Sequence, residues 1–289
     1  MVNAIPDFTR FDAHVADAIG EPCAAALRAA QAAIDAKFDA GEGDQVKRLF
    51  NASNLVRTPL GDEDFMYAVA DGPAMLDQYG QKAKLCSALA TLPAKPSADQ
   101  RIANLAGLIS QHYGDGFAGQ CFYDTTCIAN ATATGKGGLG TATNARSWRW
   151  QKCSELAYLQ SAPSKSSLRS SRLTFAALLA QCDAAFGAGT STAMLLRNKK
   201  FNTEYGGPDP RKSTLPVAAA TSIFYLDFSD DPWAEASVTE PLGPASLRLD
   251  YCMTTCAGCG HCGAGVPENL TRCDKAADAF VQTVLDNVR

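Results

Sequence analysis

The stretch IFYLDFSDDPW, Ile223–Trp233, joins a short apolar run to an acidic turn. The run belongs to a longer segment, PVAAATSIFYLDF, in which apolar and β-branched residues follow one another with few polar interruptions. Such a run is typical of a buried strand, and the Asp-Pro pair that follows it is typical of a turn. The stretch therefore predicts a strand of an α/β sheet whose following loop carries Asp230 and Asp231.

A second short strand is predicted from ASLRLDYC, residues 245–252, which leads into a cysteine-rich stretch. This stretch, Tyr251–Gly265, reads YCMTTCAGCGHCGAG and contains four cysteines and His261. Three interpretations are open for it: a metal site, a set of disulfides, or a loop that presents a catalytic histidine. Beyond it, DKAADAFVQTVLDNV, residues 274–288, predicts an amphipathic C-terminal helix.

The first part of the chain has helical periodicity. Apolar residues at three and four spacing predict helices between Phe8 and about Leu92, and ADQRIANLAGLISQHYG, residues 98–114, predicts a further one. Small and polar residues from Cys127 to Arg146 predict an ordered loop or a boundary. A phosphate loop at Gly135–Gly138 is rejected, because the order G-x-x-x-x-G-K-[ST] is missing. After this segment, TFAALLAQCDAAFG, residues 174–187, predicts another helix.

Composition limits the class of protein. With 289 residues and 46% hydrophobic content, the chain can bury a core large enough for one large domain or two smaller ones. A net charge of -4 and a pI near 5.4 predict no nucleic-acid partner, because phosphate backbones require a basic face. No apolar run approaches the roughly 20 residues that span a bilayer, so no membrane association is expected.

The cysteines point to an oxidising compartment, because there are 11 of them and they are spread along the whole chain. Three glycosylation sequons, at Asn51, Asn130 and Asn269, agree with passage through the secretory pathway. The sequence opens MVNAIPDFTRF, without the features of a signal peptide. Two interpretations follow: an unconventional intracellular protein, or a chain whose true beginning is absent.

The loops after the two predicted strands carry an acid and then a histidine. Asp231 followed by His261 is the chain order of the last two members of an α/β-hydrolase triad, in which the acid holds the imidazole and the histidine takes the serine proton. The alternative is a turn-forming Asp-Pro and an ordinary loop histidine. Adjacent carboxylates in a turn tend to point apart, so we expect only one of Asp230 and Asp231 to be functional.

Other candidates for chemistry are weaker. Zinc ligands could come from the cysteines of Tyr251–Gly265, but Cys256–Cys259 and Cys259–Cys262 share a residue instead of forming two separate pairs. Ser191, in GTSTA, precedes Asp231 in the triad order, but its surroundings are helical and a loop serine is the alternative. His14 and His112 lie in helical patterns and are expected to be surface or partly packed residues.

Four motifs occur in order along the chain: ARSWRWQKCSELAYLQSA, FNTEYGG, IFYLDFSDDPW and CGHCGAG. Together they resemble the family of lysosomal Pro-X carboxypeptidase, dipeptidyl peptidase II and thymus-specific serine protease. The resemblance covers nearly the whole chain. It implies an α/β fold, a partial α/β-hydrolase domain with an inserted, mainly helical cap. The expected division is a hydrolase remnant at 1–7, the cap at 8–143 and the C-terminal part of the hydrolase domain at 144–289.

The resemblance also implies functions for single residues. Asp231 and His261 match the family's catalytic acid and histidine, and Trp150, Gln151 and Glu155 match a segment that lines the substrate cleft. A peptide substrate is the expected partner, with a homodimer as an open alternative for assembly, and neither a cofactor nor a metal is expected. The implied location is the secretory pathway, either lysosomal or vacuolar, or extracellular.

This sequence departs from the family pattern in two places near the pair. Asp227 and Phe228 stand where the family usually has Asn-Gly, and Gly263-Ala264 stand where an acidic residue usually follows the His-Cys pair. The family's nucleophilic serine lies in a G-x-S-x-G elbow ahead of the cap, and we expect this elbow to lie outside the sequence. Three hypotheses follow: a serine exopeptidase with proline-adjacent specificity represented by an incomplete chain, an inactive homologue that serves as a binding module, and a cysteine-rich zinc protein.

Overall fold

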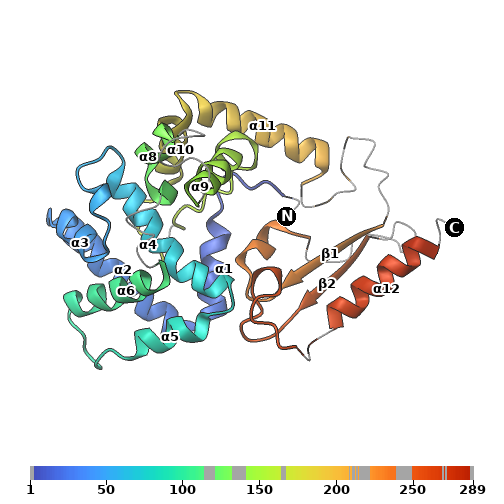
Figure 1. Cartoon of the computed structure of the whole chain (residues 1–289), viewed down its shortest axis with the longest axis horizontal. Coiled ribbons are helices and arrows are strands. Elements are labelled where there is room, and N and C mark those ends of the chain that lie inside the picture. The colour runs from blue at the N-terminus through green and yellow to red at the C-terminus, as the bar shows by residue number, and fades with distance from the viewer. Residues whose placement is uncertain are drawn as a thin grey trace.

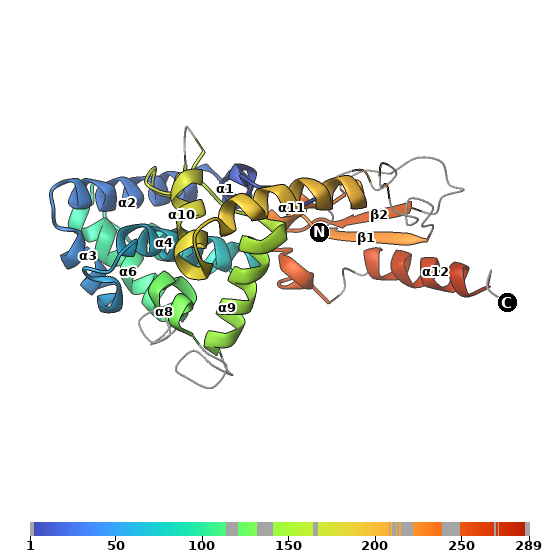
Figure 2. The ribbon, with the colours of Figure 1, turned by 90° about the horizontal axis from the view of Figure 1, so that it is seen from above.

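The computed structural model describes residues 3–113, 121–131, 141–163, 167–207, 209, 212, 214, 222–238, 249–268, 270 and 272–286. These residues form a large helical region and a small sheet with one helix beside it (Figure 1). Seen from above, the sheet and this last helix extend from one end of the helical region (Figure 2). The α/β-hydrolase assignment stays a prediction, because the described part of the chain is mostly helical and contains a single parallel strand pair.

The helical region confirms the periodicity seen in the sequence and divides it more finely. Its helices are α1 (Thr9–Ile19), α2 (Glu21–Asp39), α3 (Gly43–Leu49), α4 (Gly61–Gln78), α5 (Lys82–Ala90), α6 (Ala98–Tyr113), α8 (Thr125–Asn130), α9 (Thr141–Gln151), α10 (Phe175–Phe186) and α11 (Thr190–Tyr205). A π-helical turn, Lys152–Leu156, continues α9. The helices continue past residue 144, and the predicted domain boundary there stays a prediction.

The loop expected from Cys127 to Arg146 is wrong at both ends. Cys127 lies inside α8, whose first turn is capped by Asp124 because its Oδ1 accepts the Cys127 backbone N–H at 2.8 Å. Arg146 lies inside α9. The small and polar residues that suggested a loop are compatible with short helices once a cap and tertiary contacts support them. The glycine-rich motif at 135–138 lies outside the described residues.

One hydrophobic core runs through the helical region and reaches the loop after the first strand. It includes buried residues from α1, α2, α4 and α6, and also Trp233. The Trp233 ring contacts Phe8, Phe11, Trp148 and Tyr158, with ring centroids 5.2–5.9 Å apart. Aromatic contacts of this kind stabilise a core beyond the area that they bury. The loop that follows Asp231 is therefore fixed against the helices.

The sheet contains strands β1 (Ile223–Phe228) and β2 (Leu249–Thr254), which pair in parallel. Both strands were predicted, and the part of the first predicted run at 216–221 lies outside the described residues. Helix α12 (Arg272–Asp286) lies beside the strands, with Phe280 against Phe224 at 5.4 Å between ring centroids. The parallel pairing places the ends of β1 and β2 at the same edge of the sheet.

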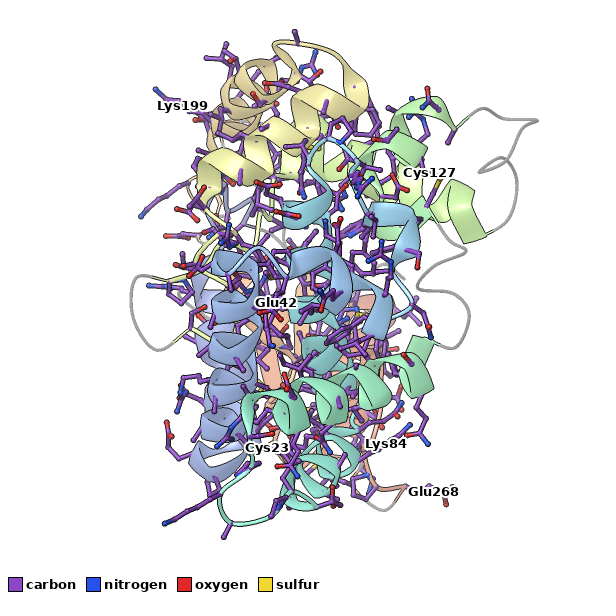
Figure 3. All side chains as sticks on the ribbon, turned by 90° about the vertical axis from the view of Figure 1, so that its left-hand side faces the viewer. Cys23, Glu42, Lys84, Cys127, Lys199 and Glu268 are labelled. Carbon is purple, nitrogen blue, oxygen red and sulfur yellow. A yellow bond between two sulfur atoms is a disulfide. The ribbon has the colours of Figure 1, made fainter. Side chains whose placement is uncertain are left out.

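Five disulfides connect these elements, as the cysteine count predicted. The pairs are Cys23–Cys86, Cys121–Cys127, Cys153–Cys182, Cys252–Cys273 and Cys256–Cys259. In Figure 3, Cys23 and Lys84 mark one end of the helical region, and Cys127 and Lys199 mark the other. Bridges therefore lie at both ends of this region. Within the described ranges, no helix is both long and apolar enough to cross a membrane.

Candidate active site

Asp231 and His261 meet at the edge of the sheet where both strands end. Asp231 follows β1 by three residues and His261 follows β2 by seven. Asp231 Oδ2 lies 2.7 Å from His261 Nδ1. This contact requires the parallel pairing, because only parallel strands bring both of these loops to one edge.

Both oxygens of the Asp231 carboxylate have a partner. Asp231 caps the 3₁₀ turn Pro232–Ala236, where its Oδ1 accepts the Trp233 backbone N–H at 3.0 Å. The other oxygen, Oδ2, faces His261. The side chain of Asp231 is only 8% exposed. The Asp-Pro-Trp sequence thus has a structural explanation, since the cap orients the carboxylate and the buried Trp233 ring anchors the turn.

The imidazole of His261 is held at one nitrogen and open at the other. The hydrogen bond to Asp231 raises the pKa of His261 above its ordinary value of 6.5, although partial burial acts in the opposite direction. Among the described residues, Nε2 has no hydrogen-bond partner, and the side chain is 29% exposed. An imidazole held in this way keeps its proton on Nδ1, which donates to the carboxylate, and has its Nε2 lone pair available as a base.

Asp230 points away from the histidine, as expected for adjacent carboxylates in a turn. Its Oδ2 lies 2.5 Å from Lys82 Nζ and also accepts the backbone N–H of Gly258. Its own backbone N–H donates to the Cys259 carbonyl at 2.9 Å. Asp230 therefore joins the loop after β1 to helix α5 and to the cysteine-rich loop, and so holds in place the loop that carries His261.

Glycines let the cysteine-rich loop pack against the end of α4. A Cβ on Gly260 would stand 2.3 Å from the Gln78 carbonyl oxygen, and a Cβ on Gly265 would stand 2.2 Å from the Gly258 carbonyl oxygen. Side chains at these positions would push the loop off the helix. The spacing CGHCGAG, 259–265, is thus explained by close backbone approach on both sides of His261.

The disulfides decide between the interpretations of Tyr251–Gly265. Cys256 pairs with Cys259, Cys252 pairs with Cys273, and Cys262 is free and exposed. A sulfur in a disulfide is not a thiolate ligand, so the zinc hypothesis loses most of its ligands. Among the described residues, no cluster of three or more metal-ligating side chains occurs. The stretch is a disulfide-braced loop that presents His261.

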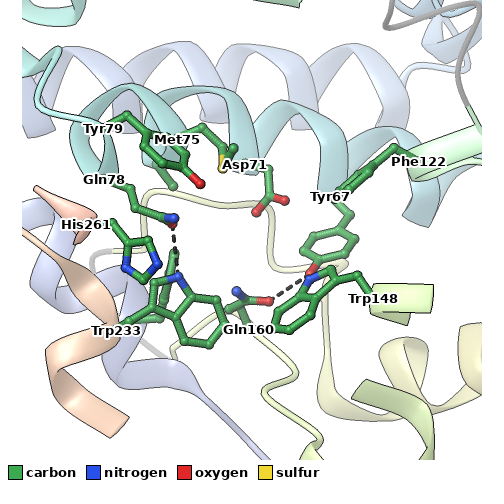
Figure 4. A pocket seen from close by; sticks show the side chains of 12 residues that line it. Tyr67, Asp71, Met75, Gln78, Tyr79, Phe122, Trp148, Gln160, Trp233 and His261 are labelled. Atoms are coloured by element: carbon green, nitrogen blue, oxygen red, sulfur yellow. Dashed lines mark hydrogen bonds between the residues drawn. The ribbon is translucent and has the colours of Figure 1, made fainter. Parts of the chain in front are cut away.

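A cavity of about 350 Å³ opens beside His261, between the sheet edge and helix α4 (Figure 4). Its position is fixed at one side by Trp233 Nε1, which donates to Gln78 Oε1 at 3.0 Å. The described residues that line it are Phe11, Tyr67, Asp71, Ala74, Met75, Gln78, Tyr79, Phe122, Trp148, Gln160, Trp233 and His261. Its size lies at the lower end of the range of ligand pockets, about 300–1,000 Å³.

The residues predicted to line the substrate cleft do not line this cavity. Trp150 contacts Phe186 edge to face and is 48% exposed, and Gln151 and Glu155 are exposed. Trp148, two residues before Trp150, does line it. The predicted function of Trp150, Gln151 and Glu155 in substrate binding stays a prediction.

The other candidates do not line the cavity beside His261. Ser191 lies in the first turn of α11, where its Oγ donates to Asp183 at 2.8 Å, so it is a helix residue and not the expected loop serine. His14 is partly packed, as expected, and contacts Glu235 Oε1 at 3.2 Å. His112 lies in α6.

The asparagines of two of the three sequons lie in the described ranges. Asn51 and Asn130 are both exposed, which is the accessibility that glycosylation requires, while Asn269 lies outside the described residues. Their glycosylation stays a prediction.

The sequence interpretation missed the polar side chains of α4. Asp64, Asp71 and Gln78 recur every seven residues in helix α4, whose central part is otherwise apolar, and this spacing places them on one face. Asp64 is buried and bonds Thr125 and Gln181, and burial raises its pKa to about 7. Asp71 and Gln78 line the cavity. A polar stripe on a buried helix was the available signal.

Comparison with known proteins returns matches to serine peptidases. Residues 2–263 match the family described as Serine carboxypeptidase S28. The chain is also 27% identical, over 270 residues, to an Arabidopsis thaliana protein named "Probable serine protease EDA2"; the match covers 90% of this chain and 48% of that protein. The chain therefore spans about half the length of this relative.

Proposed function

The chain belongs to the serine carboxypeptidase S28 family, and from this premise we propose that Asp231 and His261 are the acid and base of a serine peptidase. The observation that carries the proposal is the 2.7 Å contact between Asp231 Oδ2 and His261 Nδ1 at the mouth of an aromatic cavity. His261 Nε2 takes the proton of the serine as it attacks the peptide carbonyl and returns it to the leaving amine. Asp231 fixes the tautomer and stabilises the imidazolium.

The nucleophile is the part of this proposal that the described residues do not supply. The printed sequence has no G-x-S-x-G, and the Ser191 hydroxyl is bonded to Asp183. We propose that the serine comes from a segment outside residues 1–289, on the cavity side of His261 Nε2. The 52% of the Arabidopsis thaliana relative without a counterpart here is consistent with this (100% minus 48%).

The substrate class proposed is a peptide cleaved near one of its ends. Exopeptidase action next to proline is what the resemblance implies, and a cavity of about 350 Å³ in which half of the lining residues are Phe, Tyr or Trp suits a short peptide end. Five disulfides support a secretory, lysosomal or extracellular location, where such bonds persist.

Peptide hydrolysis by the full-length protein tests this proposal. A proline-containing chromogenic peptide is supplied to the wild type, to His261→Ala and to His112→Ala, a matched change of a histidine outside the cavity. We expect turnover by the wild type and His112→Ala and its loss in His261→Ala. Equal turnover by wild type and His261→Ala would refute the assignment of the base.

An inactive homologue that binds peptides is the second candidate. The observation that favours it is that, among the described residues, no serine hydroxyl bonds His261. Saturable peptide binding by the full-length protein without any turnover, unchanged in His261→Ala, would favour this candidate over the first.

A further inference from the structure

The cavity beside His261 contains a carboxylate that the proposed chemistry does not use. Asp71, on helix α4, lines the cavity and is partly exposed to it. Figure 4 shows its carboxylate pointing into the space between Met75 and Tyr67. Its Oδ2 accepts a hydrogen bond from the Tyr123 hydroxyl at 3.0 Å, and among the described residues Oδ1 has no partner.

Within the described ranges, no cation lies close enough to this carboxylate to form an ion pair with it. Two buried cations lie near, since both Lys152 and Arg149 are about 5 Å from the Tyr67 ring, at 5.1 and 4.9 Å. Neither lines the cavity. Lys152 donates to Tyr67 and Gln160, and burial lowers its pKa, an effect that the nearby charge of Asp71 opposes.

The walls around Asp71 are aromatic. Six of the residues that line the cavity have aromatic rings of Phe, Tyr or Trp: Phe11, Tyr67, Tyr79, Phe122, Trp148 and Trp233. The face of an aromatic ring attracts a cation, and the attraction grows when the cation leaves water. No lysine or arginine occurs among the described lining residues, so nothing there favours an anion. A carboxylate among aromatic rings is the chemistry that recognises an ammonium or guanidinium group.

We propose that Asp71 binds a positively charged group of the substrate and so selects peptides with a cation close to the bond that His261 faces. This inference rests on the proposed function and adds the substrate class to it. Two sources supply such a cation: the free N-terminus of a peptide and the side chain of a lysine or arginine. Asp71 is a specificity residue in either case, because it touches the substrate and takes no part in proton transfer.

Peptide binding tests the inference separately from turnover. Three peptides with amidated C-termini are titrated calorimetrically into full-length His261→Gln protein, so that none is cleaved: Ala-Pro-Ala, N-acetyl-Ala-Pro-Ala and N-acetyl-Lys-Pro-Ala. A charge-assisted hydrogen bond predicts at least about tenfold tighter binding of a cationic peptide than of the neutral acetylated one. Preference for the first peptide identifies the N-terminus as the source, and preference for the third identifies the side chain.

Variants at Asp71 then test whether this residue causes the preference for a cationic peptide. In the same background, Asp71→Asn is expected to bring all three peptides within about twofold of one another, while Asp71→Glu retains the preference. Asp17→Asn removes an exposed carboxylate of α1 as a control for net charge and leaves the preference unchanged. Equal or undetectable binding of the three peptides to the His261→Gln protein, in which Asp71 is unchanged, would overturn the inference. It is overturned equally by a preference that survives in folded Asp71→Asn protein. Neither result affects the assignment of His261 as the base, which the hydrolysis experiment tests separately.

Discussion

Replacing Asp231 by asparagine separates the two functions of this carboxylate. Asparagine keeps an oxygen for the Trp233 N–H, which Asp231 Oδ1 accepts at 3.0 Å, so the 3₁₀ turn is retained. At the other end, the amide NH₂ then replaces the charged partner of His261 Nδ1. The substitution therefore changes the tautomer and charge of His261 with little change of the backbone.

The expected cost follows from the contact that is lost. A hydrogen bond between charged groups contributes about 1.5–3 kcal/mol, and the 29% exposure of His261 favours the lower end, about 1.5 kcal/mol. The raised pKa of His261 sets the pH window. For a group with a raised folded-state pKa, the added stability is fully present below its unfolded value of 6.5 and is lost as pH rises through the folded-state pKa. Activity falls further, by about 10⁴-fold, because the wrong tautomer removes the base.

Urea unfolding at pH 5.5 and at pH 8.5, together with an NMR titration of the His261 ring, measures these effects. We expect Asp231→Asn to lower the free energy of unfolding at pH 5.5 more than at pH 8.5, and to lower the pKa of His261. Equal destabilisation at both pH values, with an unchanged histidine titration, would show that the pair carries no charge coupling.

Three further predictions test the surroundings of the pair. Gly260→Ala is expected to reduce turnover about 10²-fold, because its Cβ would stand 2.3 Å from the Gln78 carbonyl oxygen and displace the loop. The control Gly107→Ala, whose Cβ meets nothing within 4 Å, leaves turnover unchanged and adds about 0.5–1 kcal/mol to helix stability. Equal kinetics of the two variants would contradict this prediction. Cys86→Ser opens a bridge with a sequence separation of 63 residues and is expected to lower the free energy of unfolding by about 4 kcal/mol, so an unchanged urea midpoint would refute the estimate of its contribution. Burial, and then the charge of Asp230, raises the pKa of Asp77 to about 7, so the stability of the fold decreases as pH rises from the ordinary pKa of 3.8 through 7. Asp77→Asn is therefore expected to increase the free energy of unfolding by on the order of 2 kcal/mol at pH 8 and to leave it unchanged at pH 3.5. An increase that does not depend on pH would contradict this explanation.

Local patterns predicted the elements that local interactions determine. The periodicity between Phe8 and Leu92 predicted helices, and the apolar run that ends at Phe228 predicted a strand. The order of Asp231 and His261 predicted their meeting, because the chain order of motifs after parallel strands implies one shared edge. The helices and the strand depend on residues close together in the sequence, whereas the meeting of Asp231 and His261 depends on the parallel pairing of β1 and β2.

Features that depend on distant contacts were not predictable in the same way. The disulfide partners could not be chosen among 11 cysteines, and Cys127–Arg146 was interpreted as a loop because its helices need a cap and packing for support. Helix α4 and His261 line the same cavity although they are far apart in the sequence, so the position of Asp71 among the apolar residues of α4 was only a weak signal. Trp150 was preferred over Trp148 because motif resemblance does not specify which side chain faces a cavity.

Covalent labelling of the full-length protein tests the central claim most directly. A fluorophosphonate reacts with a serine that an adjacent histidine activates, and peptide mapping by mass spectrometry then identifies the labelled residue. The account predicts one labelled serine, other than Ser191, whose labelling is lost in His261→Gln. Absence of any labelled serine, or labelling of equal rate in wild type and His261→Gln, would contradict the claim that Asp231 and His261 serve a serine nucleophile.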